Sequence, residues 1–307
     1  MIYGVTFFGP CKGSLIVKIQ GVIKASTNPN IFCKGSWISF EHINNLEIKG
    51  GGTLDGEGAS AWGQSQCATR PYVSFHYKMF HFDIYNSNNV TLSHVHIIAP
   101  SDSPNTDGIH ISLSSNIRVF DSNIGTGDDC ISIFAGSQNV NISRVTCGPG
   151  HGISIGSLGN KPNEVVKDVH VKNCTLIATQ NGMRIKTWAS SNVGAATNIY
   201  FEDILMDKVD NPIIIDQYYC PSHTCNIKKS LVQIKGVTFN NIRGTSSSLV
   251  AVNFNCSSSL SCQKINLNDI DLINYNTKPT IASCANAIGH ATGIELPPSC
   301  LKSVLES

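Results

Sequence analysis

Charged residues are scarce in this chain of 307 residues: only 14% of the positions carry Asp, Glu, Lys or Arg, and the formal net charge is +1. A globular domain carries about 25% charged residues, so uncharged polar side chains must form most of this surface. The sequence lacks the basic stripe that binds nucleic acid and the high charge of a disordered tail. It also lacks an apolar run of the roughly 18 residues that span a membrane. We therefore expect no nucleic-acid partner and no membrane anchor.

Leucine is also sparse, with 16 Leu against 36 Ile and 20 Val, in a chain that has 26 Gly. β-Branched side chains suit pleated strands, whereas Leu is the better helix former. No change of composition and no low-complexity linker divides the chain. The composition therefore predicts an all-β protein with a single domain over residues 1–307.

The N-terminus has neither the basic n-region nor the apolar h-region of a signal peptide and opens directly in strand-like sequence. Either a signal peptide has been removed or the start of the protein is missing, and the strand-like opening favours a missing start. Twelve cysteines and four Asn-x-Ser/Thr sequons indicate an oxidising, secretory environment. The sequons are at Asn89, Asn141, Asn173 and Asn255.

An internal repeat dominates the middle of the chain. The repeated segments are TDGIHI (106–111), DDCISI (128–133), GHGISI (150–155), QNGMRI (180–185) and DNPIII (210–215). Their alignment places five polar residues in one column: Asp107, Asp129, His151, Asn181 and Asn211. The first two sequence intervals between them are equal, and the last two are equal and longer. Two apolar columns follow, made almost entirely of Ile. Coils of about 20–30 residues with short strands are typical of a parallel β-helix.

In such a fold, equivalent strands stack at about 4.8 Å, so each isoleucine column becomes an apolar wall inside the coil. Side chains alternate across a strand, so the residues between the apolar columns should point outward onto a solvent-facing groove. These are His110, Ser132, Ser154, Arg184 and Ile214. An antiparallel sandwich is the alternative, but it would show hairpin turns every 8–12 residues rather than a coil-length register.

The register predicts a cluster of carboxylates. Asp107 and Asp129 should occupy the same corner of neighbouring coils, with Asp128 beside Asp129 and His151 one coil further. Carboxylates packed this closely repel one another, so at least one pKa should rise. A carboxyl with a raised pKa can serve as general acid while its neighbour stays ionised as base, as in glycosidases.

A basic pair lies beyond this cluster. Arg184 and Lys186 are two positions apart, so both should point outward, about a coil beyond His151. Such a pair suits an anionic group of a substrate. Carboxylates beside a receptor for carboxylates predict hydrolysis of an acidic polysaccharide.

Other interpretations of the same residues remain open. Asp and Asn before a strand often only bond the local backbone in turns. An Asp cluster can bind Ca²⁺, although the neighbouring Arg and Lys would repel the ion. His94 and His96 share one strand face but have no third metal ligand nearby. The pairs Cys220–Cys225 and Cys256–Cys262 have no partner pair at zinc spacing, which favours local disulfides.

Four segments carry a family resemblance. SPNTDGIHI, GTGDDCISI, CGPGHGISIGSLG and NGMRIKTW resemble, in this order, the signature blocks of the polygalacturonases, glycoside hydrolase family 28. The similarity runs from GPCKG through NPIIIDQYYC to the C-terminal PPSC and is greatest to the plant, pollen and exo-acting type. The resemblance implies a right-handed parallel β-helix. It also implies hydrolysis of α-1,4-linked galacturonan in pectin, with inversion and without metal or other cofactor.

The resemblance also implies roles for single residues. Asp129 resembles the proton donor, and Asp107 and Asp128 resemble the pair that positions and activates water. His151 matches a histidine that supports the acid and the sugar. Three further residues resemble those that bind the substrate, namely Arg184 and Lys186 at the galacturonate carboxylate and Tyr219 in the subsite.

Four disulfides are implied by the resemblance: Cys130 with Cys147, Cys220 with Cys225, Cys256 with Cys262, and Cys284 with Cys300. Cys11, Cys33, Cys67 and Cys174 are left unassigned, and Cys174 lies in a strand where it could be a buried thiol. The resemblance further implies a secreted monomer that acts on pectin in the cell wall.

This chain departs from the family pattern in two places. It lacks the N-terminal coils and their cap, and the stretch between Cys67 and KMFHFDI is short by about one coil. We expect family geometry from about residue 79 to 275, with disorder or strain before it, and weak activity from a truncated or mis-spliced form. The alternatives are a catalytically silent, allergen-like wall protein that binds pectin, and a Ca²⁺-dependent pectate lyase. The resemblance favours exo action, which the columns themselves do not decide.

Overall fold

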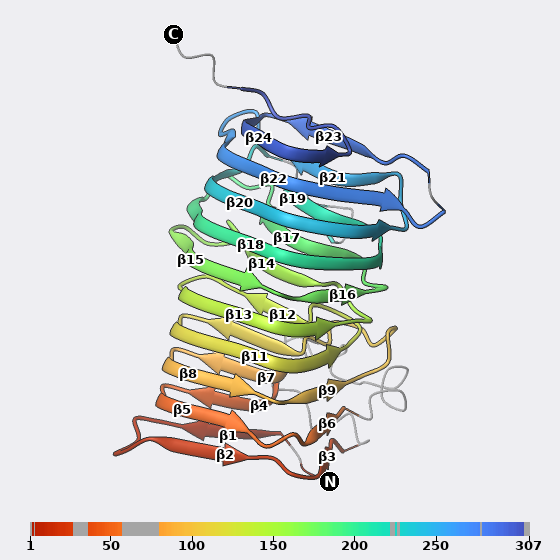
Figure 1. Cartoon of the computed structure of the whole chain (residues 1–307). Helices are drawn as coiled ribbons and strands as arrows, with labels where there is room; N and C mark the ends of the chain where they lie inside the picture. Colours follow the sequence, from red (N-terminus) through yellow and green to blue (C-terminus); the bar gives the residue numbers. More distant parts are fainter. Residues whose placement is uncertain are drawn as a thin grey trace.

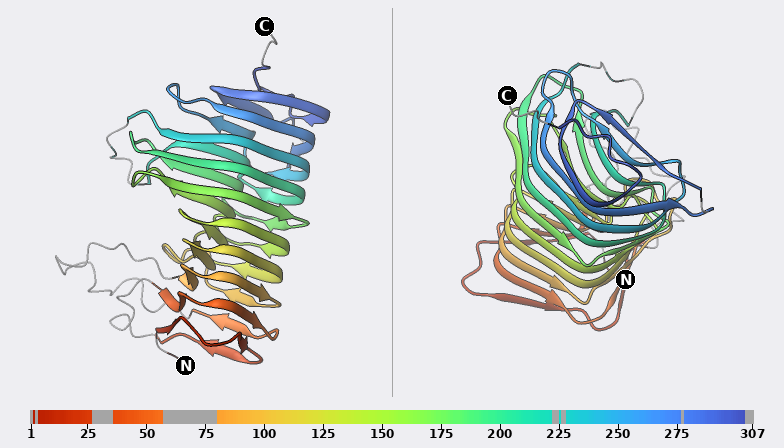
Figure 2. Two further views of the ribbon diagram at one scale, coloured as in Figure 1. Left: turned by 90° about the vertical axis from the view of Figure 1, so that its left-hand side faces the viewer. Right: turned by 45° about the horizontal axis from the view of Figure 1, so that its top comes forward.

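The computed structural model describes residues 2, 4–26, 36–56, 80–221, 225, 228–276 and 278–303. These residues form 24 β-strands and no α-helix, and none of them belongs to a helix that could cross a membrane. The chain winds through successive coils that stack along one axis (Figures 1 and 2). The fold is a right-handed parallel β-helix, as the repeat and the resemblance predicted.

One wall of the helix is a parallel sheet of ten strands. In spatial order its strands are β1 (Val5–Phe8), β4 (Ser36–Glu41), β7 (Phe80–Tyr85), β10 (Ile109–Ser112), β12 (Ile131–Ile133), β14 (Ile153–Leu158), β17 (Asn181–Trp188), β19 (Asn211–Tyr219), β21 (Val250–Asn255) and β23 (Ile281–Ala285). All the candidate catalytic and substrate-binding residues lie in these strands or immediately before them.

The remaining walls belong to a bent sheet of fourteen strands. Its main path is β2 (Leu15–Lys18), β5 (Asn44–Lys49), β8 (Asn88–Ser93), β11 (Ser115–Gly125), β13 (Gln138–Cys147), β15 (Glu164–Lys172), β18 (Val193–Val209), β20 (Leu231–Ser246), β22 (Cys262–Asn274) and β24 (Ala287–Leu296). The short strands off this path are β3 (Val22–Lys24), β6 (Thr53–Asp55), β9 (His96–Ile98) and β16 (Thr175–Ile177).

The isoleucine ladder pairs in the predicted register. Ile109 pairs with Ile131, and Ile131 pairs with Ile153. The column continues to Met183 and Ile213. All five side chains are buried, so each coil closes the apolar core of the next one. Because burying such a side chain contributes about 1.5–3 kcal/mol, this repeated column is a main source of stability.

The coils before residue 57 continue the same ladders. Strand β4 pairs directly with β7, β5 with β8, and β6 with β9, and all three pairs are parallel. The expected interruption before residue 79 is therefore wrong for the described residues, because the coils on either side of the short segment stack directly on each other. The segment 57–79 itself lies outside the described residues.

The coils differ in length, but the register between paired strands stays the same. Ser132 follows its partner on the preceding coil by 22 residues. Arg184 follows its partner by 30 residues, and Asn255 follows its partner by 39 residues. Most of the residues added in the coil before Arg184 lie between Ile155 and Lys167, where β14 leads into β15. Additional length is therefore placed at strand ends and in turns, outside the core.

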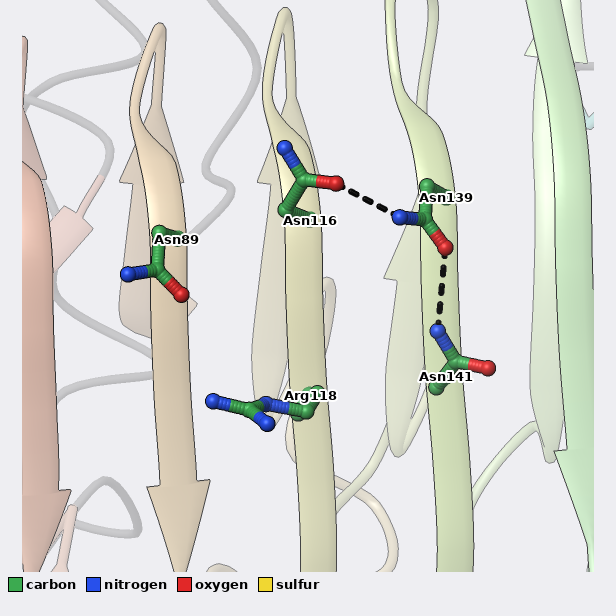
Figure 3. Close-up of a pocket in the computed structure, with 5 residues that line it drawn as sticks. All are labelled: Asn89, Asn116, Arg118, Asn139 and Asn141. Carbon is green, nitrogen blue, oxygen red and sulfur yellow. Dashed lines mark hydrogen bonds between the residues drawn. The ribbon is translucent and has the colours of Figure 1, made fainter.

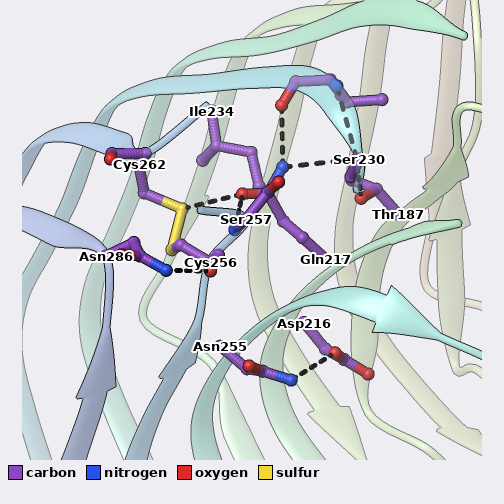
Figure 4. The surroundings of a disulfide bond; sticks show 12 residues. Thr187, Asp216, Gln217, Ser230, Ile234, Asn255, Cys256, Ser257, Cys262 and Asn286 are labelled. Atoms are coloured by element: carbon purple, nitrogen blue, oxygen red, sulfur yellow. Dashed lines mark hydrogen bonds between the residues drawn. A yellow bond between two sulfur atoms is a disulfide. The ribbon is translucent and has the colours of Figure 1, made fainter. Parts of the chain in front are cut away.

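The four expected disulfides are present: Cys130–Cys147, Cys220–Cys225, Cys256–Cys262 and Cys284–Cys300. Around Cys256–Cys262 the amide of Asn286 donates a hydrogen bond to the carbonyl of Cys256 at 3.0 Å (Figure 4). Cys174 is a buried free thiol and Cys11 an exposed one. Cys33 and Cys67 lie outside the described residues.

Candidate active site

The outward side chains of the ten-strand sheet form one row across the coils. His110, Ser132, Ser154 and Arg184 are paired in register on β10, β12, β14 and β17. The sequence predicted that this row faces solvent, and that is wrong for its central members. Ser154 is 0% and Arg184 7% exposed, because hydrogen bonds between neighbouring coils pack the row against itself.

Asp107 and Asp129 meet beside this row, as the column predicted. Asp107 precedes β10, Asp129 precedes β12, and the two are 4% and 1% exposed. Asp128, next to Asp129, differs from both because 16% of its side chain is exposed. The site thus contains two buried carboxyls and one that is partly exposed.

Asp129 is held by two cations. Arg184 donates from Nη2 to its Oδ1 at 2.6 Å, and Lys186 donates from Nζ to its Oδ2 at 2.9 Å. Burial alone would raise the pKa of Asp129, but the charges of Lys186 and Arg184 and the hydrogen bonds from Lys186 and Ser154 lower it. A carboxylate stabilised in this way keeps its negative charge. This does not fit the role of proton donor that the resemblance implied for Asp129.

Asp107 has the opposite electrostatics. Burial and the negative charges of Asp128 and Asp129 raise its pKa well above the usual range, and only the hydrogen bond from Ser132 and the charge of Lys186 act against this. The rise that the sequence predicted for at least one carboxyl is therefore found at Asp107. The cluster holds an additional proton at pH values at which an isolated Asp is ionised.

His151 contacts Asp128, the partly exposed carboxyl. Its Nδ1 lies 2.9 Å from Oδ1 of Asp128, and 34% of the His151 side chain is exposed. Asp128, Asp129 and His151 bring ligand atoms within 4.8 Å of one another, as in a metal site. However, both oxygens of Asp129 already bind the cationic groups of Arg184 and Lys186. The donor set therefore suits proton transfer better than it suits a metal ion.

An aromatic wall borders the basic pair. The Nζ atom of Lys186 lies 5.2 Å from the centre of the Tyr219 ring, which contacts the Trp188 ring at 5.4 Å. This geometry allows a cation–π interaction. It places Tyr219 beside the basic pair, where the resemblance expected a subsite residue.

Asp216 is a feature of the site that the sequence analysis did not single out. It pairs in register with Lys186, one coil further on. Its Oδ1 accepts hydrogen bonds from the backbone of Tyr218 at 2.9 Å and from Asn255 at 3.3 Å (Figure 4). Burial raises its pKa. The repeat contained the signal for this residue, because Asp216 follows the DNPIII segment as Lys186 follows QNGMRI.

A hollow lies on the outer face of the fourteen-strand sheet, away from the candidate active site. It has a volume of about 290 Å³ and is lined by Asn89, Asn116, Arg118, Asn139 and Asn141. Asn139 donates to Asn116 at 2.5 Å, and Asn141 donates to Asn139 at 3.2 Å (Figure 3). Asn89, Asn116 and Asn139 have positive φ angles, which Asn tolerates in turns. The lining has no carboxyl group for acid or base chemistry, so this hollow is not the catalytic site.

Comparisons with known proteins agree with the geometry. The profile of glycosyl hydrolases family 28 matches residues 3–75 and 73–293. An exopolygalacturonase of Platanus acerifolia is 42% identical over 94% of this chain and 83% of its own length. A polygalacturonase of Nicotiana tabacum is also 42% identical, over 97% of this chain and 81% of its own.

Solved structures share the fold. An endo-xylogalacturonan hydrolase from Aspergillus tubingensis superposes with a TM-score of 0.75 at 21% identity, over 95% of this chain and 90% of its own. An endopolygalacturonase from Stereum purpureum, complexed with two galacturonates, superposes with a TM-score of 0.61 at 17% identity. The latter match covers 97% of this chain and 93% of that one.

Proposed function

Because the chain belongs to glycosyl hydrolases family 28, we propose that it hydrolyses the α-1,4 bonds between galacturonate units of pectin. The observation that carries this proposal is the meeting of three carboxyls with two cations in one register. Asp107, Asp128 and Asp129 supply the acid and base chemistry, and Arg184 and Lys186 supply a receptor for the carboxylate of each sugar unit.

Asp128 is the residue that we assign as proton donor, in place of Asp129. A general acid must reach the oxygen of the leaving sugar, and Asp128 is the one of the three carboxyls that is partly exposed, at 16% of its side chain. The negative charge of Asp128 raises the pKa of Asp107, so the two carboxyls lie close enough to serve one displacement. His151, which contacts Asp128, orients this carboxyl toward the substrate.

Asp107 and Asp129 act on the attacking water in this scheme. Asp107 is the stronger base of the two because its pKa is raised, whereas that of Asp129 is lowered. Water attacks the anomeric carbon, Asp107 takes the proton of the water, and Asp128 gives its proton to the leaving oxygen. One displacement of this kind inverts the configuration.

The basic pair binds the substrate. In the free protein Arg184 and Lys186 bind Asp129. A galacturonate carboxylate that arrives beside Tyr219 shares these donors, since guanidinium and ammonium groups bind carboxylates through charge-assisted hydrogen bonds. The aromatic ring of Tyr219 offers an apolar face to the sugar.

We further propose that the enzyme acts from chain ends and outside the cell. Exo action is supported by similarity to exopolygalacturonases of Platanus acerifolia and Oenothera organensis, which are 42% and 40% identical to this chain. Secretion to the cell wall is supported by the four disulfides, which persist in oxidising compartments. Sizing of the first products released from long galacturonan tests exo action, since an exo enzyme releases only short products.

A reducing-end assay on polygalacturonate in the presence of a chelator tests the function. We expect new reducing ends, and proton NMR of the first product should show the β-anomer. An unsaturated product that absorbs in the ultraviolet would instead indicate a lyase. Binding without turnover would indicate a silent wall protein on the same scaffold.

A further inference from the structure

A three-membered hydrogen-bonded chain ends on Asp129. The guanidinium of Arg184 donates from Nε to Oγ of Ser154 at 2.8 Å, and Ser154 donates to Oδ1 of Asp129 at 2.7 Å. Asp129 thus accepts a hydrogen bond from the hydroxyl of Ser154, and Arg184, two coils beyond Asp129, fixes the direction of that hydroxyl. Arg184 also belongs to the proposed substrate receptor.

A second chain of the same form ends on Asp107. The Nδ1 atom of His110 lies 2.8 Å from Oγ of Ser132, and Ser132 donates to Oδ2 of Asp107 at 2.7 Å. In both chains the serine follows its carboxylate by 25 residues, one coil further on. His110 thus contacts the serine that bonds Asp107, as Arg184 contacts the serine that bonds Asp129, but His110 lies on the same coil as its carboxyl, whereas Arg184 lies two coils beyond Asp129.

The hydrogen-bond pattern fixes the donor. A serine hydroxyl carries a single proton, and Ser132 donates that proton to Oδ2 of Asp107. The contact between His110 and Ser132 must then use a proton on Nδ1 of the histidine. His110 is thus the donor in its contact with Ser132.

Two aromatic rings hold His110 in place. Phe80 stacks on it with a centroid distance of 4.1 Å and an angle of 7°, and Phe134 contacts it at 5.7 Å and 42°. These rings come from the preceding and the following coil, so the imidazole is fixed on both sides. Because the His110 ring is fixed, Ser132 has a hydrogen-bond partner at a constant position.

We propose that His110 is a positioning residue for catalysis, which acts through Ser132 to hold Asp107 in the orientation in which it accepts the proton of the attacking water. This inference rests on the proposed function. It assigns a role to a residue outside the set of acid, base and substrate-binding groups.

The proposal predicts an effect on the pH profile, because the hydrogen bond from Ser132 lowers the pKa of Asp107. Asp128, Asp129 and Lys186 also act on Asp107 through their charges. Loss of the bond should raise the pKa of Asp107 further. The base must be ionised, so the acid limb of activity should move to higher pH.

The residue that pairs with His110 on the neighbouring strand is acidic. Asp83 on β7 pairs with His110 in register, and burial and the charge of Glu41 raise the pKa of Asp83 to about 7. Both groups remain unchanged in the variants below, so their titration is common to every profile that is compared.

The test compares His110→Phe, which keeps the ring but removes the donor, with the wild-type enzyme on polygalacturonate. We expect kcat to fall about tenfold, KM to stay within about twofold, and the acid limb to rise by about one pH unit. His110→Asn, which retains a side-chain donor, should shift the acid limb less than His110→Phe does. His170→Phe is the matched control, since the His170 ring contacts the Tyr200 ring at 4.4 Å, with a tilt of 31°, on the fourteen-strand sheet.

Ser132→Ala separates positioning from packing. It should reproduce the shift of the acid limb, and His110→Phe should add little to it, because both changes break one chain. If His110→Phe lowers only the melting temperature and keeps kcat and the pH profile, the inference is overturned. If the wild-type enzyme hydrolyses no galacturonan, the proposed function itself is overturned.

Discussion

The ammonium nitrogen of Lys186 lies 2.9 Å from Oδ2 of Asp129, although 57 positions separate the two residues in the chain. The β-helix register brings them together across two coils, from β12 to β17. Both side chains are almost fully buried. The same nitrogen therefore stabilises the carboxylate of Asp129, which we propose to be catalytic, and belongs to the proposed carboxylate receptor.

Replacement of Lys186 by Met should affect both stability and substrate binding. Removal of one partner from a buried ion pair costs about 3–5 kcal/mol, and Arg184 offsets part of this by remaining on Asp129. We expect the free energy of unfolding to fall by about 2–4 kcal/mol. The KM for polygalacturonate should rise more than that for methyl-esterified pectin. Lys208→Met, at an exposed position of β18, is the control that should change neither quantity.

Asp128→Asn and Asp129→Asn should be distinguishable with an activated substrate. On galacturonan, both should lower kcat by at least about 100-fold, as removal of acid or base catalysis does. An aryl galacturonide with a good leaving group needs no proton donor, so Asp128→Asn should retain most of its activity there, while Asp129→Asn should not. The reverse pattern would return the role of proton donor to Asp129.

Asp83 should make stability depend on pH. Its folded pKa of about 7 lies above the ordinary value of 3.8, because of burial and the charge of Glu41. The protonated form is therefore favoured in the folded state, and stability is lost as the pH rises from about 4 to 7. In urea unfolding, Asp83→Asn should match the wild type near pH 4 and exceed it by about 2–4 kcal/mol at pH 8. A difference that is the same at both pH values would contradict this.

The Cys130–Cys147 disulfide should matter more than its loop length implies. It closes 17 residues, for which chain entropy contributes about 3 kcal/mol, against about 2 kcal/mol for the 6 residues of Cys256–Cys262. Conversion of either pair to alanine should lower the melting temperature. Only loss of Cys130–Cys147 should also lower kcat, because Cys130 directly follows Asp129. Equal kcat values for the two variants would refute the link to catalysis.

The coil register was predictable because it depends on spacing alone. One column of isoleucines at constant offset determines which strands pair, and the structure pairs Ile131 with Ile109 and Ile153 as the repeat predicted. The position of Asp107 and Asp129 at one corner followed from the same sequence spacing. Long side chains were less predictable, because Arg184 and Lys186 reach across coils on flexible stems.

The burial of the site could not be derived from the sequence. Alternation shows that Ser132 and Ser154 point outward, but not that they bond Asp107 and Asp129 on the preceding coils. The pairing of β4 with β7 was also missed, because the shortened segment before residue 80 suggested an interruption. Stacking depends on the strands themselves, which keep their apolar alternation on both sides of that segment.

The unequal coils separate two kinds of change in this molecule. Steps of 22, 30 and 39 residues all join strands of the same sheet in the same register, so a turn can lengthen while its strand keeps the same partners. A mutation in the isoleucine column disturbs the packing of the coils on both sides, whereas an insertion in a turn changes only the edge of the sheet. A change in turn length can therefore alter the preference among pectic substrates, while the proposed acid and base residues keep their geometry.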